Sequence, residues 1–181
     1  MAVFGCGGGA TATPATTSGQ PASAIPSVGG APVPPPAGGE SASVTLTGGD
    51  DAGSYTASGE PNCTNGLLGT GTWGVQFSLA EAAADQLSSV QLVYRSDGTG
   101  GGDDDMFGGV STLFTVAFGS LMEPEYRDYE VEVRTDGEES SGTGTVTVTD
   151  NGSTAVIHAV GTTAEGVGID ATVNCPSVMR M

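Results

Sequence analysis

The stretch TVTVTDNGSTAVIHAV, residues 145–160, decides the fold class of this chain. Apolar and polar residues alternate on both sides of Asn151-Gly152, and this is the period of a strand that buries one face. An Asn-Gly pair suits a two-residue type I′ turn, because both central positions of that turn need positive φ. The sequence therefore predicts a β-hairpin whose turn lies at Asn151 and Gly152.

The turn also fixes the register that we expect for this hairpin. Pairing Asp150 with Ser153 sets alternate residues of the two strands opposite one another. The expected pairs are Val148 with Ala155 and Val146 with Ile157 on one face, and Thr145 with His158 on the other. His158 is then expected on a solvent-facing or edge surface, as a structural strand residue.

Similar alternation recurs in short segments separated by Gly, Asp and Asn clusters. The segments are Val44/Leu46, Val75/Phe77/Leu79, Val90/Leu92/Tyr94, Phe114/Val116/Phe118, Tyr129/Val131/Val133, Val146/Val148 and Val167/Ile169/Ala171/Val173. They predict an all-β, antiparallel β-sandwich of seven or eight strands over residues 44–181. One short helix is a candidate from Ala80 to Gln86, because residues 81–84 favour a turn or two of helix.

The charge balance excludes some classes of partner. The chain has 21 acidic residues against four arginines and no lysine, and its formal net charge is −17. Nucleic acid and anionic lipid headgroups would be repelled by such a surface. No apolar stretch approaches the ~20 residues that span a bilayer. Any membrane association is therefore expected to be covalent or peripheral.

A short motif near the amino terminus suggests a covalent anchor. Val3-Phe4-Gly5-Cys6 resembles the lipobox of bacterial lipoproteins, and a run of small, uncharged residues follows it. The resemblance implies that the Cys6 thiol carries lipid, that residues 1–5 are the remnant of a signal peptide, and that the protein is extracytoplasmic and held at the membrane or envelope by its lipid.

The residues after Cys6 predict a spacer. Residues 7–43 contain seven prolines and a single charged residue, Glu40, and almost no large apolar side chain. Such a segment buries too little surface to offset the entropy of ordering. We expect residues 6–43 to be a lipidated, disordered tether, with residues 44–181 as the only domain.

The cysteine count fits an exported domain with one bridge. Cys6 is assigned to lipid, and Cys175 lies in phase with the apolar residues of the last strand. Export makes a disulfide between Cys63 and Cys175 the expected state. Two free buried thiols are the alternative.

The layout of the whole chain resembles the mycobacterial nineteen-kilodalton lipoprotein antigens. The resemblance rests on the lipobox, the tether, an early strand, Cys63, and the closing segment 161–175, which ends at Cys175. It implies a surface-displayed β domain and offers no catalytic residues to carry over. The insertion of residues 97–109 departs from that pattern.

The sequence lacks the combinations of residues that common enzyme motifs require. His158 is the only histidine, and no G-x-S-x-G motif accompanies it. Residues 69–74 match G-x-G-x-x-G, but a strand follows them instead of the helix that a dinucleotide site requires. Glu130 and Glu132 are predicted on the solvated side of a strand, and Trp73 in the core. We expect a non-enzymatic lipoprotein that binds an envelope protein or a small ligand.

An acidic, glycine-rich loop leaves a second function open. Residues 97–105 read DGTGGGDDD, and calcium favours several carboxylate and backbone oxygens on a flexible chain. The candidate ligands are Asp97, Asp103, Asp104 and Asp105, with Glu138 and Glu139 as further contributors. The alternative function is a calcium-dependent binding protein or hydrolase, while the favoured interpretation is a solvated loop without a cofactor.

Overall fold

Eleven strands form two sheets in the computed structural model, which describes residues 40–67, 69–96 and 109–181. Within these residues there is no helix. The strands are β1 (Ala42–Thr47), β2 (Gly53–Ala57), β3 (Asn62–Asn65), β4 (Thr72–Ser78), β5 (Leu87–Arg95), β6 (Val110–Phe118), β7 (Arg127–Arg134), β8 (Gly142–Asp150), β9 (Ala155–Thr163), β10 (Gly168–Cys175) and β11 (Met179–Arg180).

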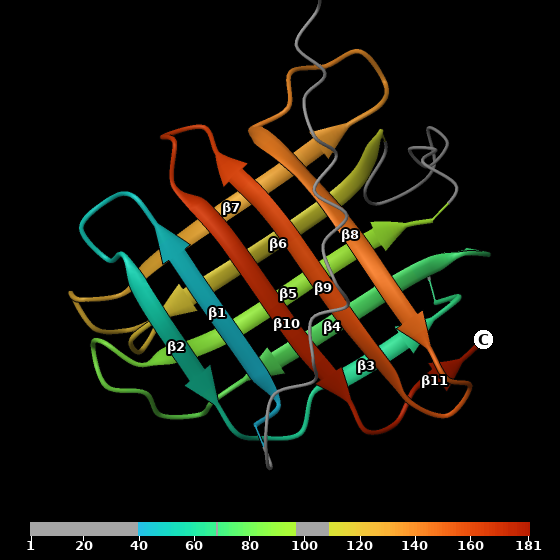
Figure 1. Ribbon diagram of the computed structural model, residues 1–181, viewed down its shortest axis with the longest axis horizontal. Coiled ribbons are helices and arrows are strands. Elements are labelled where there is room, and N and C mark those ends of the chain that lie inside the picture. Colours follow the sequence, from blue (N-terminus) through green and yellow to red (C-terminus); the bar gives the residue numbers. More distant parts are fainter. Residues whose placement is uncertain (1–39, 68, 97–108) are drawn as a thin grey trace, which may run out of the picture. The chain divides into compact units, whose positions relative to one another are not determined.

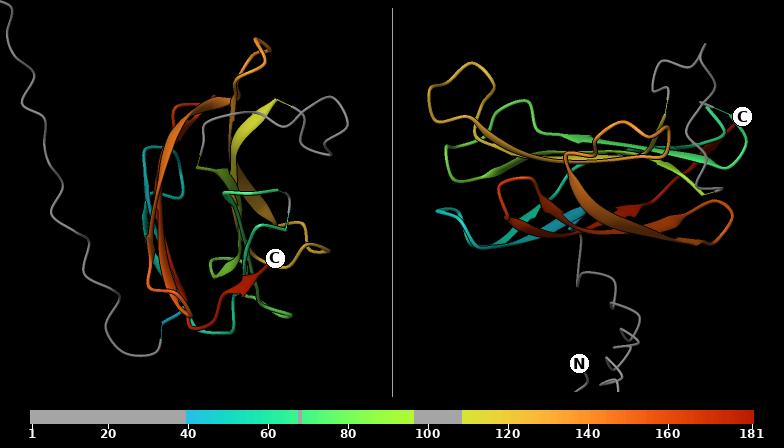
Figure 2. Two further views of the ribbon diagram at one scale, coloured as in Figure 1. Left: turned by 90° about the vertical axis from the view of Figure 1, so that its right-hand side faces the viewer. Right: turned by 90° about the horizontal axis from the view of Figure 1, so that it is seen from above.

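The two sheets lie face to face as layers (Figures 1 and 2). The five-stranded sheet has the order β2-β1-β10-β9-β8, and the six-stranded sheet has the order β11-β3-β4-β5-β6-β7. All neighbouring strands are antiparallel except β11 and β3. In Figure 1 the strands of the five-stranded sheet run across those of the other. The predicted all-β sandwich is therefore confirmed.

Alternate residues of the strands build the core between the sheets. Phe77, Phe114 and Phe118 of the six-stranded sheet are all 0% exposed, and Leu46 and Ile169 of the five-stranded sheet are nearly as buried. Removing such side chains from water contributes about 2 kcal/mol each. The period-two pattern thus identified the inward faces of these strands correctly.

Two glycines allow the sheets to pack closely around Phe114. Gly144 of β8 pairs with Gly161 of β9. A Cβ atom at Gly161 would lie 3.0 Å from the Phe114 ring, and one at Gly144 would lie 3.3 Å from it. The missing side chains leave the space that this ring fills.

The predicted register of the β8–β9 hairpin is wrong by two residues. The observed pairs are Asp150 with Ala155, Val148 with Ile157, Thr147 with His158 and Val146 with Ala159. Because a shift of two preserves the face of every side chain, Ile157 and Ala159 are still buried. The expected burial was right although the expected partners were not.

The turn itself explains the shift. Only Gly152 has a positive φ, at 85°, and Asn151 does not adopt one, so the type I′ prediction is wrong. The Asn151 N–H donates to the Thr154 carbonyl at 2.9 Å, and the Gly152 N–H donates to Oδ1 of Asp150 at 2.9 Å. The carboxylate of Asp150 thus binds the N–H of Gly152. The turn is closed by Asn151 and Thr154 instead of Asp150 and Ser153, so its centre lies one residue further along the chain.

Three strands were missed, and the helix prediction is wrong. The missed strands are β2, β3 and β11, and β1 begins at Ala42, two residues before the predicted domain boundary. Instead of a helix, the Ala80–Gln86 segment makes a turn in which the Gln86 N–H donates to the Ala83 carbonyl at 3.0 Å. The pairing of β4 with β5 sets both ends of this segment, and that constraint outweighs its local helix propensity.

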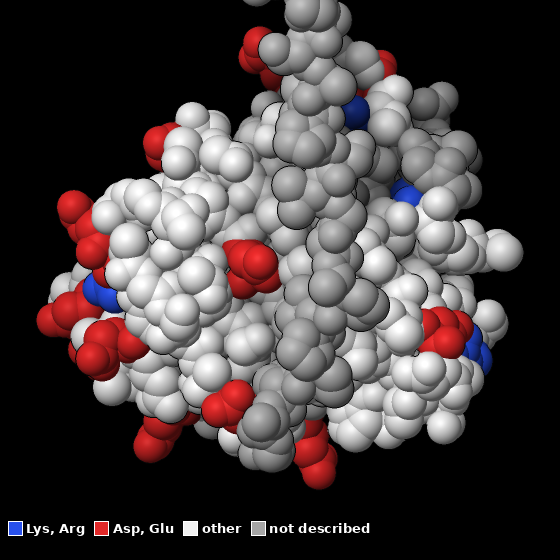
Figure 3. Space-filling view, in the orientation of Figure 1, with Lys and Arg blue, Asp and Glu red and all other residues white. Residues whose placement is uncertain are grey.

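Acidic groups dominate the charged surface. On the face of the five-stranded sheet, they lie mostly near the rim (Figure 3). The described residues contain no helix long and apolar enough to cross a membrane.

Candidate functional site

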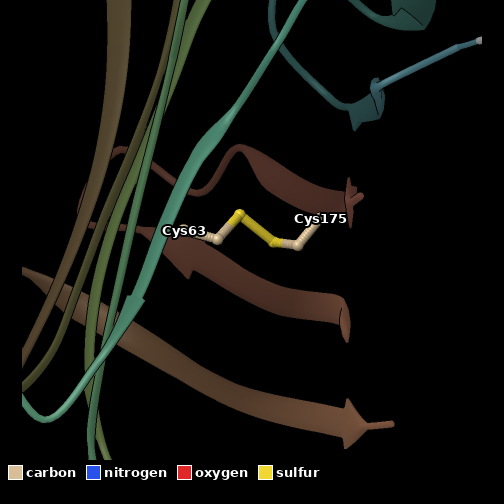
Figure 4. The surroundings of a disulfide bond; sticks show 2 residues. All are labelled: Cys63 and Cys175. Carbon is tan, nitrogen blue, oxygen red and sulfur yellow. A yellow bond between two sulfur atoms is a disulfide. The ribbon is translucent and has the colours of Figure 1, made fainter. Parts of the chain in front are cut away.

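Cys63 and Cys175 form a disulfide bond (Figure 4), as the sequence predicted. Cys63 lies in β3 of the six-stranded sheet, and Cys175 ends β10 of the five-stranded sheet. The Cα atoms are 6.0 Å apart, and each residue is 2% exposed. The bond joins the two layers and closes a sequence separation of 112 residues. A buried disulfide is consistent with an extracytoplasmic location.

Two of the predicted sites lie outside the described residues. They are the lipidation site Cys6 and the acidic loop with Asp97, Asp103, Asp104 and Asp105. Glu138 and Glu139 are described and are exposed. In the part of the chain that the structure describes, no group of three or more His, Cys, Asp or Glu side chains is placed to hold a metal ion.

His158 lies on the outer face of the five-stranded sheet. Its Nε2 atom is 2.8 Å from Oδ1 of Asp170 on the neighbouring strand β10. Its cross-strand neighbours are Thr147 and Thr172. No described hydroxyl or thiol donates to its imidazole, so this pair lacks the nucleophile contact that a catalytic triad requires.

The other residues singled out in the sequence have structural surroundings. Glu130 is exposed, and Glu132 forms an ion pair with Arg134 at 2.9 Å. Trp73 is 5% exposed and packs in the core, as predicted. The glycine-rich segment at residues 69–74 leads into β4, which begins at Thr72, so a strand follows it as expected.

A hollow of about 270 Å³ lies on the outer face of the six-stranded sheet. Gly74 of β4 pairs with Thr64 on one side and with Val93 on the other. A Cβ atom at Gly74 would lie only 2.7 Å from Oγ1 of Thr64, so the floor of the hollow requires a glycine. The hollow is lined by Asn62, Thr64, Leu67, Thr72, Gly74, Val75, Gln76, Leu92 and Val93. Its lining carries amides, hydroxyls and aliphatic groups but no charge, which suits a small, uncharged, polar ligand.

This hollow was not predicted from the sequence. A glycine inside a strand pattern is the signal that could have indicated it, since such a glycine often marks a place where another group approaches the backbone. Leu67, at 54% exposed, is a large apolar side chain in its lining. The side chains around Gly74 come from β3, β4 and β5 and from the β3–β4 connection, so only their pairing brings them together.

A polar cluster at one end of the sandwich was also not predicted from the sequence. Asp51, in the β1–β2 loop, accepts a hydrogen bond from the Tyr129 hydroxyl at 2.5 Å and pairs with Nε of Arg127 at 2.8 Å. Burial, followed by the hydrogen bond to Asp51, raises the pKa of Tyr129 to about 12. The cluster joins β7 to the opposite sheet, and this structural role accounts for its buried polar contacts.

The chain matches no protein-family model, no curated protein and no solved structure. The function proposed below therefore depends on the motif at Cys6 and on the geometry of the domain.

Proposed function

We propose that this chain is a non-enzymatic binding domain, held on the outer side of a bacterial membrane by lipid on Cys6. The buried disulfide between Cys63 and Cys175 carries the proposal, because such bonds form and persist in oxidising compartments. The Val3–Cys6 motif supplies the anchor. Two or more acyl chains hold a protein firmly, since each buried methylene contributes ~0.8 kcal/mol and one chain alone is marginal.

The surroundings of His158 support the non-enzymatic part of the proposal. Its partner is Asp170 on an open sheet face, and side-chain exposures of 25% and 55% leave both groups in contact with water. A general base works best in a site that excludes water and orients a nucleophile. This pair is better explained as a cross-strand contact between β9 and β10.

The hollow over Gly74 is the candidate ligand site of this domain. Asn62 and Gln76 offer amide donors and acceptors beside the aliphatic Leu67 and Val93. Uncharged donors and acceptors select polar ligands without charge, because an ionic group would lose hydration without gaining a counter-charge. A small polar molecule, or a polar side chain of an envelope partner, fits this chemistry.

Lipid labelling tests the anchor. The gene is expressed in a bacterium with an in-frame export signal, and incorporation of labelled fatty acid and partitioning into detergent are measured. We expect both for the wild-type chain and neither for Cys6→Ser, while Ser18→Ala in the tether should change nothing. Label retained in Cys6→Ser would contradict the proposal.

Filling the hollow tests the ligand site. Val93→Tyr places a large ring in the hollow, and Thr45→Tyr places the same ring on an exposed position of β1, in the other sheet. A panel of neutral sugars and amides is screened by thermal shift against both variants and the wild type. We expect any stabilising compound to lose its effect in Val93→Tyr alone. Equal binding by all three proteins would place the site elsewhere.

A further inference from the structure

Strand β8 is a long open edge of the five-stranded sheet. It pairs with β9 on one side only, and no other described strand pairs with its second side. Its nine residues run from Gly142 to Asp150, and the first eight contain neither a charged residue nor a proline. Natural proteins usually protect such an edge with charge, proline, a bulge or a short strand, because an open edge is a template for another strand.

The other three edges of the described sandwich carry such protection. β11 has two residues and β2 has five. β7 has eight residues, of which five are charged: Arg127, Asp128, Glu130, Glu132 and Arg134. In a chain with net charge −17, the lack of charge on β8 is therefore a local exception.

The register shows which backbone groups of β8 face outward. The Asn151 N–H donates to the Thr154 carbonyl, and hydrogen-bonded pairs then alternate along the hairpin. The N–H and C=O groups of Thr149, Thr147 and Thr145 therefore point toward β9. Those of Val148 and Val146 point away from the sheet, where an added strand would bond to them.

We propose that β8 is a homodimer interface, in which β8 of a second copy of this chain pairs antiparallel with it. A two-fold axis at Val146 overlaps all nine residues, and sets Gly142 opposite Asp150 of the other copy. Both five-stranded sheets would then continue as one sheet of ten strands. Exposed threonines from both copies would lie beside one another on the outer face, and the half-buried Val146 and Val148 would be covered further.

The two ends of β8 carry different charge, and this favours an antiparallel copy of the same strand over a parallel one. Before β8, the turn to β7 carries the exposed Glu138 and Glu139. After β8, the guanidinium of Arg180 is held against Asp150 and the Gly152 carbonyl, with 40% of its side chain exposed. Antiparallel pairing therefore sets the acidic turn of each copy beside the Arg180–Asp150 ion pair of the other and keeps the two acidic turns apart. The strand is thus complementary to itself in hydrogen bonding, and its like charges do not meet.

Sedimentation equilibrium tests the dimer with the full chain carrying Cys6→Ser, so that the result does not depend on the lipid anchor or on the ligand hollow. We expect a monomer–dimer equilibrium between low micromolar and submillimolar concentrations. Thr147→Lys adds a cation beside the two-fold axis, and Thr45→Lys adds the same charge to an exposed position on β1. Because symmetry doubles each substitution, Thr147→Lys should raise the dissociation constant about tenfold, while Thr45→Lys should not.

Cross-linking tests the register without disturbing the core. Residue 145 of one copy lies opposite residue 147 of the other, at a non-hydrogen-bonded pair whose Cα separation of about 4.5 Å suits a disulfide. With Cys6→Ser in every chain, a mixture of Thr145→Cys and Thr147→Cys chains should form a cross-linked heterodimer on mild oxidation, and a mixture of Thr45→Cys and Thr147→Cys chains should not. A monomer at every concentration, or a dimer unaffected by Thr147→Lys, would overturn the proposal.

Discussion

The Tyr129 hydroxyl donates a hydrogen bond of 2.5 Å to Oδ2 of Asp51, and this contact joins the two sheets at one end of the sandwich. Tyr129 belongs to β7, and Asp51 lies in the loop between β1 and β2. The Arg127 guanidinium approaches the same carboxylate oxygen, at 2.8 Å. One carboxylate thus holds a phenol and a guanidinium from the facing sheet.

Tyr129→Phe should destabilise the domain by about 1–2 kcal/mol, because it removes a hydrogen bond to a charged group and leaves the ring in place. The free energy of unfolding is measured with urea. Tyr94→Phe is the matched control, since the Tyr94 ring packs against the core and its hydroxyl has no hydrogen-bond partner among the described residues. Equal losses in both variants would contradict a specific role for the Asp51 contact.

The same contact predicts a loss of stability in alkali. The folded protein holds the pKa of Tyr129 at about 12, against an ordinary value of 10.0. A raised pKa in the folded state means that the stabilisation is complete below the unfolded value and declines as pH rises from about 10 to about 12. Unfolding followed over that range should show this decline in the wild type, and a smaller decline in Tyr129→Phe. Identical pH profiles of the two proteins would contradict the attribution of the alkaline loss of stability to Tyr129.

Arg180→Gln should loosen the carboxyl-terminal segment. Arg180 bonds to Asp150 and to the Gly152 carbonyl, and its guanidinium lies 5.7 Å from the Trp73 ring. Amide exchange should quicken at Val178 and Met181, whose N–H groups donate to the Ser153 and Asn65 carbonyls. The melting temperature should fall by a few degrees.

The carboxyl-terminal segment should lose stability in acid, whereas the Tyr129 contact loses it in alkali. The Arg180 hydrogen bond, followed by the Gly152 N–H, lowers the pKa of Asp150 below 3.8. A lowered folded-state pKa gives stability that is present above the unfolded value and is lost as pH falls through the folded value. The protection factor of the Val178 amide, which is the intrinsic exchange rate divided by the observed rate, should therefore fall in strong acid in the wild type. In Arg180→Gln this protection factor should be low already at neutral pH.

Reduction of the disulfide should cost about 4–5 kcal/mol, because the bridge spans 112 residues and restricts the unfolded chain accordingly. Urea unfolding of the Cys6→Ser chain is compared with and without reductant. A chain that also carries Cys63→Ala and Cys175→Ala should have the same free energy of unfolding as the reduced protein, and reductant should not change it. Unchanged stability on reduction would mean that the bridge does not constrain the unfolded state.

The response to calcium distinguishes two interpretations of residues 97–105, a solvated acidic loop and a metal site. If the loop is solvated, millimolar calcium should stabilise the protein no more than magnesium does at matched ionic strength, because both act as diffuse counter-ions. A real site would give a saturable, calcium-specific rise in melting temperature, lost in a chain carrying Asp103→Asn and Asp104→Asn. We expect the first result.

Local sequence determined most of the strands and their buried faces. The alternation of Phe114, Val116 and Phe118 sufficed to place β6 in the core, since side chains in a strand point to opposite faces with period two. Cys63 and Cys175 could be paired from the count of cysteines together with the phase of the last strand. The hollow over Gly74 was not found, because its lining comes from three paired strands and an adjoining connection.

Only the tertiary structure decided the short strands, the hairpin register and the open edge. The residues of β2, β3 and β11 carry too little apolar alternation to identify themselves, and they become strands because a neighbour supplies their hydrogen bonds. Asp150 and Arg180, 30 residues apart, together hold the turn that sets the β8–β9 register. Whether β8 lies inside a sheet or at its edge depends on the order of the strands. The alternation of apolar and polar residues indicates which face of a strand is buried. It does not determine the order of the strands, because contacts between distant segments select the pairing partners.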